Sequence, residues 1–193
     1  MKKPIMLWIT SRSRSSMVSN IFIQHGVWWG NTHAKISGYE MYENQEIKQL
    51  QNKYNPKWGR PFCRPIEASD DVFLDFRREL RKIVPDGVKW MMKTGVEYFN
   101  AYKALKPYNV FIRRNPEDVA KSLSSKRKDV QYEEALKVAK WRFAYMEELE
   151  REHGGVYVNT DLIKAGEFSQ IKMALEYCGL EPDEEKIKKG ISR

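Results

Sequence analysis

Residues 109–122 read Asn-Val-Phe-Ile-Arg-Arg-Asn-Pro-Glu-Asp-Val-Ala-Lys-Ser, and they predict a buried strand, a sharp turn and the start of a helix. The run Val110–Ile112 is short and apolar, as in a strand that is covered on both faces. Asn115 suits the N-cap of a helix, and Pro116 suits its first position. The two arginines before Asn115 are therefore expected at the carboxyl end of a strand, where open α/β sheets bind ligands.

This turn carries the groups that bind a phosphate. Arg113 and Arg114 are expected beside a helix N-terminus, and Ser122 falls in the first turns of the same helix. Guanidinium groups, backbone N–H groups and a hydroxyl together make a good phosphate receptor. A solvated basic turn on an ordinary α/β unit explains these residues equally well when they are taken alone.

Strands and helices alternate along the chain. Further strands are predicted at Ile5–Thr10, Val88–Thr94 and Val156–Asn159. Helices are predicted after Met17, and at 43–54, 69–84, 95–106, 132–153, 168–178 and near the C-terminus, while residues 27–42 are predicted to be irregular. This alternation predicts an α/β fold of three layers, in which a parallel sheet is flanked by helices on both faces. The length suits one domain, residues 1–193.

The carboxyl ends of the predicted strands are polar and mostly basic. Parallel strands bring these ends to one edge of the sheet, so the residues that follow them are expected to converge there. They are Arg14, Lys93, Arg113, Arg114 and Asp161. This convergence predicts an anion-binding cleft.

A polar loop follows the first predicted strand. It reads Ser11-Arg12-Ser13-Arg14-Ser15-Ser16, and the next helix starts near Met17. Strand, polar loop and helix is the layout of a phosphate-binding loop, but glycine and the pattern Gly-x-x-x-x-Gly-Lys-Ser/Thr are missing, which disfavours an ATP or GTP loop of the usual kind. Serine and arginine can still offer hydroxyls, N–H groups and guanidinium groups to an anion. The alternative is a flexible, phosphorylatable patch.

The composition limits the classes of ligand and partner that the protein is expected to bind. A net charge of +8 favours an anionic ligand, but the lysines are scattered beside acids, which disfavours a nucleic-acid surface. The sequence has no apolar run that could span a membrane, and its start reads as a strand, so a cytoplasmic location is expected. Cys63 and Cys178 are expected to be free thiols, and the three histidines form no zinc-like cluster. The oligomeric state stays open.

The stretch Arg114-Asn115-Pro116-Glu117-Asp118-Val119-Ala120-Lys121-Ser122 resembles the 3′-phosphate motif of sulfotransferases that use 3′-phosphoadenosine 5′-phosphosulfate (PAPS). The family form is Arg-(Asn/Asp)-Pro-x-Asp-x-x-x-Ser, and every fixed position is matched. The resemblance implies the P-loop nucleoside-triphosphate-hydrolase-like fold of this family. It also implies that Arg114 and Ser122 hold the 3′-phosphate of the nucleotide.

The loop after the first strand is similar to the family's 5′-phosphosulfate loop, in which Lys or Arg precedes Ser-Gly-Thr. Arg14 would then contact the 5′-phosphate and the sulfuryl group, and the rest of the loop would bind the cofactor through Ser11, Arg12, Ser13, Ser15, Ser16 and Met17. Ser16 stands where the family has Gly, and Met17 where it has Thr or Ser. Lys188-Lys189-Gly190 resembles a late basic motif, which would place Lys189 at the 3′-phosphate.

The resemblance also suggests the catalytic groups. The Lys-Thr-His segment of the cytosolic animal enzymes appears as Lys93-Thr94-Gly95, so their catalytic histidine is absent. Arg14 and Lys93 would stabilise the charge on the sulfuryl oxygens, and no metal is implied. Tyr42-Glu43-Asn44-Gln45-Glu46-Ile47 resembles a stretch of bacterial and phage members, which makes Glu43 the first candidate for the general base. Glu40 and His33 are the alternatives.

The predicted activity is transfer of a sulfuryl group from PAPS to an acceptor hydroxyl, with 3′,5′-ADP as the product. The alternatives are a P-loop-like nucleotide kinase and a catalytically inactive nucleotide-binding relative, which the departures at Ser16 and Met17 favour. The acceptor hydroxyl could belong to a small molecule, a glycan or a lipid. The aromatic stretches around Trp28-Trp29 and Trp58-Phe62 suggest a partly apolar or ring-shaped acceptor, unless they only pack the loops.

Overall fold

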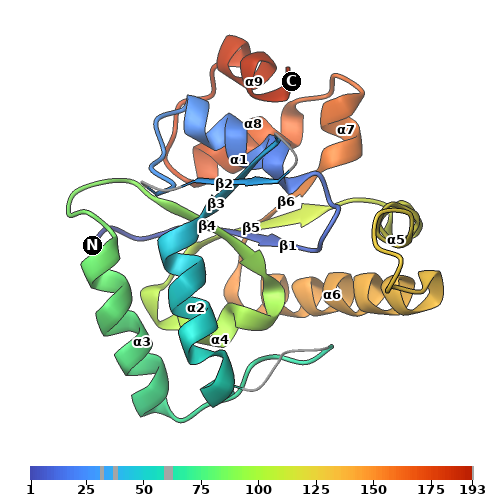
Figure 1. Cartoon of the computed structure of the whole chain (residues 1–193). Coiled ribbons are helices and arrows are strands. Elements are labelled where there is room, and N and C mark those ends of the chain that lie inside the picture. Colours follow the sequence, from blue (N-terminus) through green and yellow to red (C-terminus); the bar gives the residue numbers. More distant parts are fainter. Residues whose placement is uncertain (31–32, 37–38, 59–62, 193) are drawn as a thin grey trace.

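The computed structural model describes residues 1–30, 33–36, 39–58 and 63–192, and the side chains in these ranges other than those of 33–36, 39–41 and 58. Its centre is a parallel four-stranded sheet in the order β4-β1-β5-β6 (Figure 1). The strands are β1 (Ile5–Ile9), β4 (Met91–Gly95), β5 (Tyr108–Arg113) and β6 (Val156–Asn159). The predicted parallel α/β sheet is therefore confirmed.

Helices cover both faces of this sheet (Figure 1). One face carries α1 (Ser15–Gln24), α7 (Thr160–Lys164), α8 (Ser169–Tyr177) and α9 (Glu184–Ile191). The other carries α2 (Gln45–Trp58), α3 (Asp70–Ile83), α4 (Phe99–Tyr102) and α6 (Tyr132–His153). The remaining helix, α5 (Pro116–Ser124), packs against α6. No helix among the described residues has the length and apolar character needed to cross a bilayer.

The side chains of β1 point alternately to the two faces of the sheet. Ile5 and Leu7 of β1 pack under α1 and α8, whereas Met6 and Trp8 pack toward α2, α3 and α6. All four side chains are fully buried, which explains why this strand is a continuous apolar run.

The segment predicted to be irregular contains an antiparallel hairpin of β2 (His33–Ile36) and β3 (Tyr39–Asn44). The helix predicted from Glu43 begins at Gln45 instead. Asn44 explains the later start, because its side-chain oxygen accepts a hydrogen bond from the backbone N–H of Ile47 at 3.0 Å. Glu43 therefore lies near the end of a strand and not in the first turn of a helix.

The segment before the central strand also differs from the prediction. The strand predicted at Val88–Thr94 is Met91–Gly95, and the helix predicted at 95–106 is broken into two 3₁₀ turns that flank α4. Val96, Phe99 and Tyr102 are buried at a spacing of three residues. That period suits tight three-residue turns better than a continuous α-helix.

Gly190 sets how closely α9 approaches α1. A Cβ at this position would lie 2.6 Å from Ile21 Cγ1 and 2.8 Å from Ile21 Cα. The carbonyl of Gly190 also accepts a hydrogen bond from Asn20 Nδ2 at 3.0 Å. The glycine of the late basic motif is thus required by helix packing.

Gly190→Ala is expected to lower the free energy of unfolding by about 1–3 kcal/mol, because the added methyl group must push α9 away from α1. Urea denaturation measures the change. Glu185→Ala on the same helix is the control, since this side chain is 86% exposed, and it should change stability by less than about 0.5 kcal/mol. Equal stability of Gly190→Ala and the wild-type protein would contradict the close packing.

Candidate active site

The loop between β1 and α1 has an unusual backbone. Arg12 and Arg14 adopt left-handed conformations, with φ of +67° and +58°. Such conformations are uncommon for residues with a side chain, and strained residues of this kind cluster at ligand-binding sites. The hydroxyl of Ser13 is fully buried and has no hydrogen-bond partner among the described residues. The loop contains no glycine, but it has backbone angles that are typical of glycine.

Asp161 joins three chain segments at the carboxyl edge of the sheet. Its Oδ1 lies 2.5 Å from Nη1 of Arg14 and 3.7 Å from Nε of Arg114. Its Oδ2 accepts a hydrogen bond from the backbone N–H of Asn115 at 3.4 Å. The predicted convergence of Arg14, Arg114 and Asp161 is thus present in the structure.

The first loop also contacts the helix that follows the central strand. Arg12 Nε donates a hydrogen bond to Ser122 Oγ at 3.1 Å, and Arg114 Nη1 donates one to the carbonyl of Arg12 at 3.0 Å. Arg114 Nε is buried and has no hydrogen-bond partner among the described residues. Asn115 caps α5 as predicted, since its Oδ1 accepts from the N–H groups of Glu117 and Asp118. Two predicted phosphate-binding segments therefore lie side by side.

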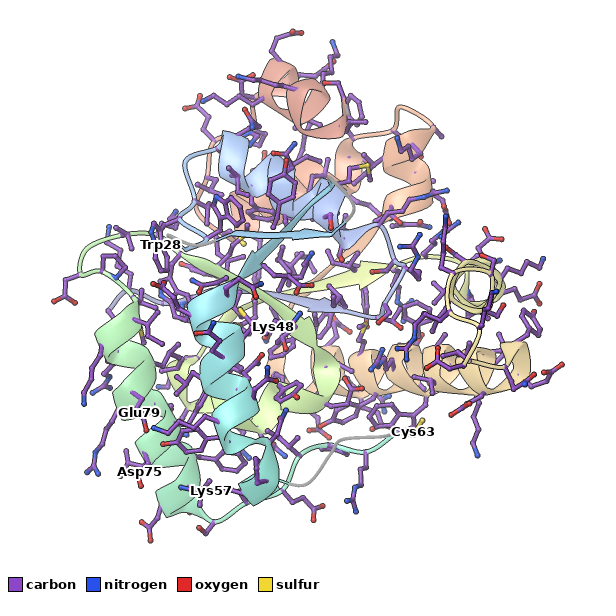
Figure 2. The ribbon with its side chains drawn as sticks, viewed as in Figure 1. Trp28, Lys48, Lys57, Cys63, Asp75 and Glu79 are labelled. Carbon is purple, nitrogen blue, oxygen red and sulfur yellow. The ribbon has the colours of Figure 1, made fainter. Side chains whose placement is uncertain are left out.

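Lys93 approaches the same loop from β4. It is almost fully buried, and its Nζ donates a hydrogen bond to Ser16 Oγ at 3.1 Å. Glu43 Oε1 lies 3.7 Å from this ammonium group, and its other oxygen pairs with Lys48, which is labelled on α2 in Figure 2. Arg14, Ser16, Lys93 and Glu43 thus surround the start of α1. This places cations and a carboxylate at one helix N-terminus.

The remaining residues that were predicted for the site lie in different parts of the structure. The side chains of Met17 and Ser15 are buried, and Met17 packs into the core beneath α1. Ser11 is exposed and lines a hollow beside the loop. Lys189 is exposed on α9, the helix that packs on α1. Glu40 and His33 lie in β3 and β2, and their side chains fall outside the described part of the chain.

Arg113 does not join the pair around Asp161. It pairs with Glu147 of α6, and its guanidinium lies 4.1 Å from the ring centre of Tyr157. Arg113 and Arg114 together line a hollow of about 370 Å³ between the turn after β5 and α6. The strand alternation sends neighbouring arginines to different partners, which the predicted convergence did not take into account.

The sequence analysis missed two charged residues that lie beside the first loop. Arg142 of α6 donates from Nε to Glu97 Oε1 at 2.7 Å and from Nη1 to Thr10 Oγ1 at 3.2 Å. Glu97 follows β4 and is only 2% exposed. A signal was present in the sequence, because Arg142 falls between Ala139 and Met146 on the inward stripe of a long amphipathic helix. A charge on that stripe needs a buried partner.

Asp161→Asn is expected to weaken the binding of inorganic phosphate about 2- to 5-fold, because the two guanidinium groups lose the carboxylate that holds them side by side. A thermal-shift titration with phosphate measures the change. Asp129→Asn removes the carboxylate of an exposed pair with Arg127 and should leave phosphate binding unchanged. Stronger phosphate binding in Asp161→Asn would mean that Asp161 mainly competes with the anion for the two guanidinium groups.

Comparison with known proteins identifies the fold. No family model matches the sequence, and no curated protein matches it. Among solved structures, the chain is similar to the sulfotransferase domain of the Synechococcus PCC 7002 olefin synthase, with 12% identity and a TM-score of 0.56 over 100% of this chain and 79% of that one. It is also similar to mouse sulfotransferase SULT7A1 complexed with PAP, with 14% identity and a TM-score of 0.61 over 99% of this chain and 63% of the mouse chain. The chain therefore has the α/β fold of the sulfotransferases.

Proposed function

We propose that the chain is a sulfotransferase that moves a sulfuryl group from PAPS to an acceptor hydroxyl and releases 3′,5′-ADP (PAP). The observation that carries the proposal is the direct contact between the two phosphate-binding segments, through Arg12 with Ser122 and Arg114 with Arg12. A nucleotide with phosphates at both its 3′ and 5′ positions needs two adjacent anion sites. The bound PAP of the mouse neighbour supports the same ligand class.

At the 3′-phosphate end, we assign the binding to Arg114 and Ser122. Arg114 offers a buried Nε that has no hydrogen-bond partner among the described residues. Ser122 offers a hydroxyl that already accepts a bond from Arg12, so a phosphate could be bound by all three side chains. The binding of the 3′-phosphate by Lys189 of α9 stays a prediction. Charge-assisted bonds of this kind are the strong ones in phosphate recognition.

At the 5′ end, the loop from Ser11 to Ser16 would hold the phosphosulfate, with Arg14 and Lys93 beside the sulfuryl group. PAPS supplies the sulfuryl group when it is bound. Fixed cations stabilise the charge that spreads over the transferring oxygens, as in phosphoryl transfer. Lys93 is almost fully buried, so its charge acts in a region of low dielectric constant. The hydrogen bond to Ser16 orients its ammonium group.

The departures from the family pattern favour a second candidate, a nucleotide-binding protein without transfer activity. Met17 packs in the core and offers no side-chain hydroxyl to an anion. Ser16, by contrast, accepts a hydrogen bond from Lys93, so its side chain has a partner in the site. We favour transfer activity because Arg14 and Lys93 both lie beside the loop, where they could stabilise the sulfuryl oxygens. The predicted single domain, cytoplasmic location and independence from metals stay predictions.

Titration with PAP in a calorimeter tests the nucleotide site. We expect a dissociation constant in the micromolar range or below, about −8 kcal/mol, with much weaker binding of 5′-AMP and ATP. Arg114→Ala should weaken PAP binding about 10- to 100-fold, because a charge-assisted hydrogen bond is lost. Arg127→Ala is the matched control, since this exposed arginine pairs with Asp129 outside the site.

The outcomes separate the candidates. Equal affinity for PAP and 5′-AMP would contradict a 3′-phosphate site, and tighter binding of ATP would favour the kinase. PAP binding without release of labelled sulfate to any acceptor would favour the inactive protein.

A further inference from the structure

A hollow of about 440 Å³ opens beside the phosphate loop, at the carboxyl ends of β1 and β4. Ile9 and Ser11 line it from the first strand and its loop, and Gly95 lines it from β4. Its remaining lining residues are Asn55, Glu97, Tyr98 and Arg142. The volume is in the range of small-molecule sites, and Ser11 belongs to both the hollow and the loop. A ligand in this hollow would lie next to the 5′ end of the nucleotide.

One carboxylate oxygen of Glu97, in the wall of this hollow, has an unusual environment. Its Oε1 is bonded to Arg142, whereas Oε2 is buried and has no hydrogen-bond partner among the described residues. A buried carboxylate oxygen without a partner costs free energy, and such atoms in folded proteins need an explanation. A ligand hydroxyl that donates its proton to this oxygen would satisfy it.

The absence of a side chain at Gly95 makes room for this carboxylate. A Cβ at Gly95 would lie 2.4 Å from Glu97 Oε2, which is far inside contact distance. Glu97 therefore fills the space that a residue with a side chain would occupy at the end of β4. This is also the position where the resemblance expects a histidine that the chain lacks.

The wall is polar and offers both donors and acceptors. Tyr98 donates its hydroxyl hydrogen to Asn55 Oδ1 at 3.0 Å, and burial raises the pKa of Tyr98, so the phenol stays protonated. Arg142 and Glu97 neutralise each other as an ion pair. A neutral molecule with several hydroxyls fits such a wall better than a flat apolar ring does.

Trp28 and Trp29, two of the aromatic residues that suggested a ring-shaped acceptor, are not among the residues that line this hollow. Trp28 pairs with Trp90 through the backbone and packs on the core, and Trp29 packs against Tyr42. The side chain of Trp58 and the whole of Phe62 lie outside the described part of the chain.

We propose that this hollow is the acceptor site, that it takes a small polyhydroxy compound such as a sugar or polyol, and that Glu97 accepts the proton of the reacting hydroxyl. The inference rests on the proposed sulfotransferase function. In the step, the acceptor oxygen forms a bond to sulfur, and its proton moves to Glu97 Oε2. The bond from sulfur to the bridging oxygen of the 5′-phosphate breaks, and PAP leaves with that electron pair.

Glu97 and Glu43 compete for this role. Each oxygen of the Glu43 carboxylate lies beside an ammonium group, one from Lys93 and one from Lys48. Both oxygens of Glu43 therefore already have a cationic partner. Within the described part of the chain, Glu97 pairs with one cation, Arg142, through Oε1, and its Oε2 has no hydrogen-bond partner. Glu43 is therefore better suited to position Lys93, and Glu97 to take the proton.

A transfer assay with labelled PAPS tests the inference. The acceptors are glycerol, myo-inositol and glucose, with 4-nitrophenol as the flat apolar comparison. We expect sulfated product from polyhydroxy acceptors, with transfer at least 100-fold slower in Glu97→Gln, the size expected of a general base. PAP affinity of Glu97→Gln should stay within 2-fold of the wild-type value. Glu79→Gln is the control, because this carboxylate lies on α3 and bonds to Lys53 and Tyr54 (Figure 2).

Gly95→Ala provides a second variant if Glu97→Gln folds poorly. Its methyl group displaces the Glu97 carboxylate, so transfer should fall while PAP still binds. A preference for 4-nitrophenol, or no transfer to any polyhydroxy acceptor by a protein that binds PAP, would overturn the acceptor class. Transfer that survives in Glu97→Gln but is lost in Glu43→Gln would show that Glu43, and not Glu97, accepts the proton. Failure of the wild-type protein to bind PAP would instead refute the proposed function itself.

Discussion

The carboxylate of Asp161 is the contact on which the site depends. Two guanidinium groups, from Arg14 and Arg114, approach the same Oδ1, although they lie far apart in the sequence. Without a negative charge between them, they would repel each other at this distance. Asp161 is partly exposed, so its contribution to overall stability is modest. Its importance is geometric, because it aligns three segments at one edge of the sheet.

The same contact explains how a loop without glycine keeps a strained shape. Arg12 and Arg14 have positive φ, at a cost of about 1–3 kcal/mol each for residues with a side chain. Each of these arginines then makes a specific side-chain contact, Arg12 with Ser122 and Arg14 with Asp161. Charged hydrogen bonds of this kind offset part of that strain. In phosphate loops of the usual sequence, glycine gives this conformation at little cost. Here, side-chain partners replace it.

The sequence predicted the features that local chemistry determines. Asn115 caps α5, the apolar runs of β1 and β5 are buried on both faces, and α6 begins at Tyr132 and ends at His153 as expected. The prediction failed where tertiary contacts determine the local structure, as in the hairpin of β2 and β3. The pair of Arg142 and Glu97 was missed for the same reason, since 45 residues separate two side chains that meet only after folding. The inward stripe of α6 could have marked Arg142 as a buried charge, but the sequence does not show which carboxylate it meets.

The end of β4 carries Lys93 and leads into Glu97, and the strand geometry explains where each side chain lies. Lys93 and Gly95 are two residues apart and so face the same side of the sheet. The Lys93 side chain reaches the start of α1 on that side, and Gly95 leaves an open space that Glu97 fills after the chain turns. Under the proposed function, Lys93 would stabilise the departing group and Glu97 would take the proton of the acceptor, so both groups would come from one strand end. In the proposed reaction, these two groups would hold donor and acceptor in line without a histidine, because one strand end fixes the positions of both.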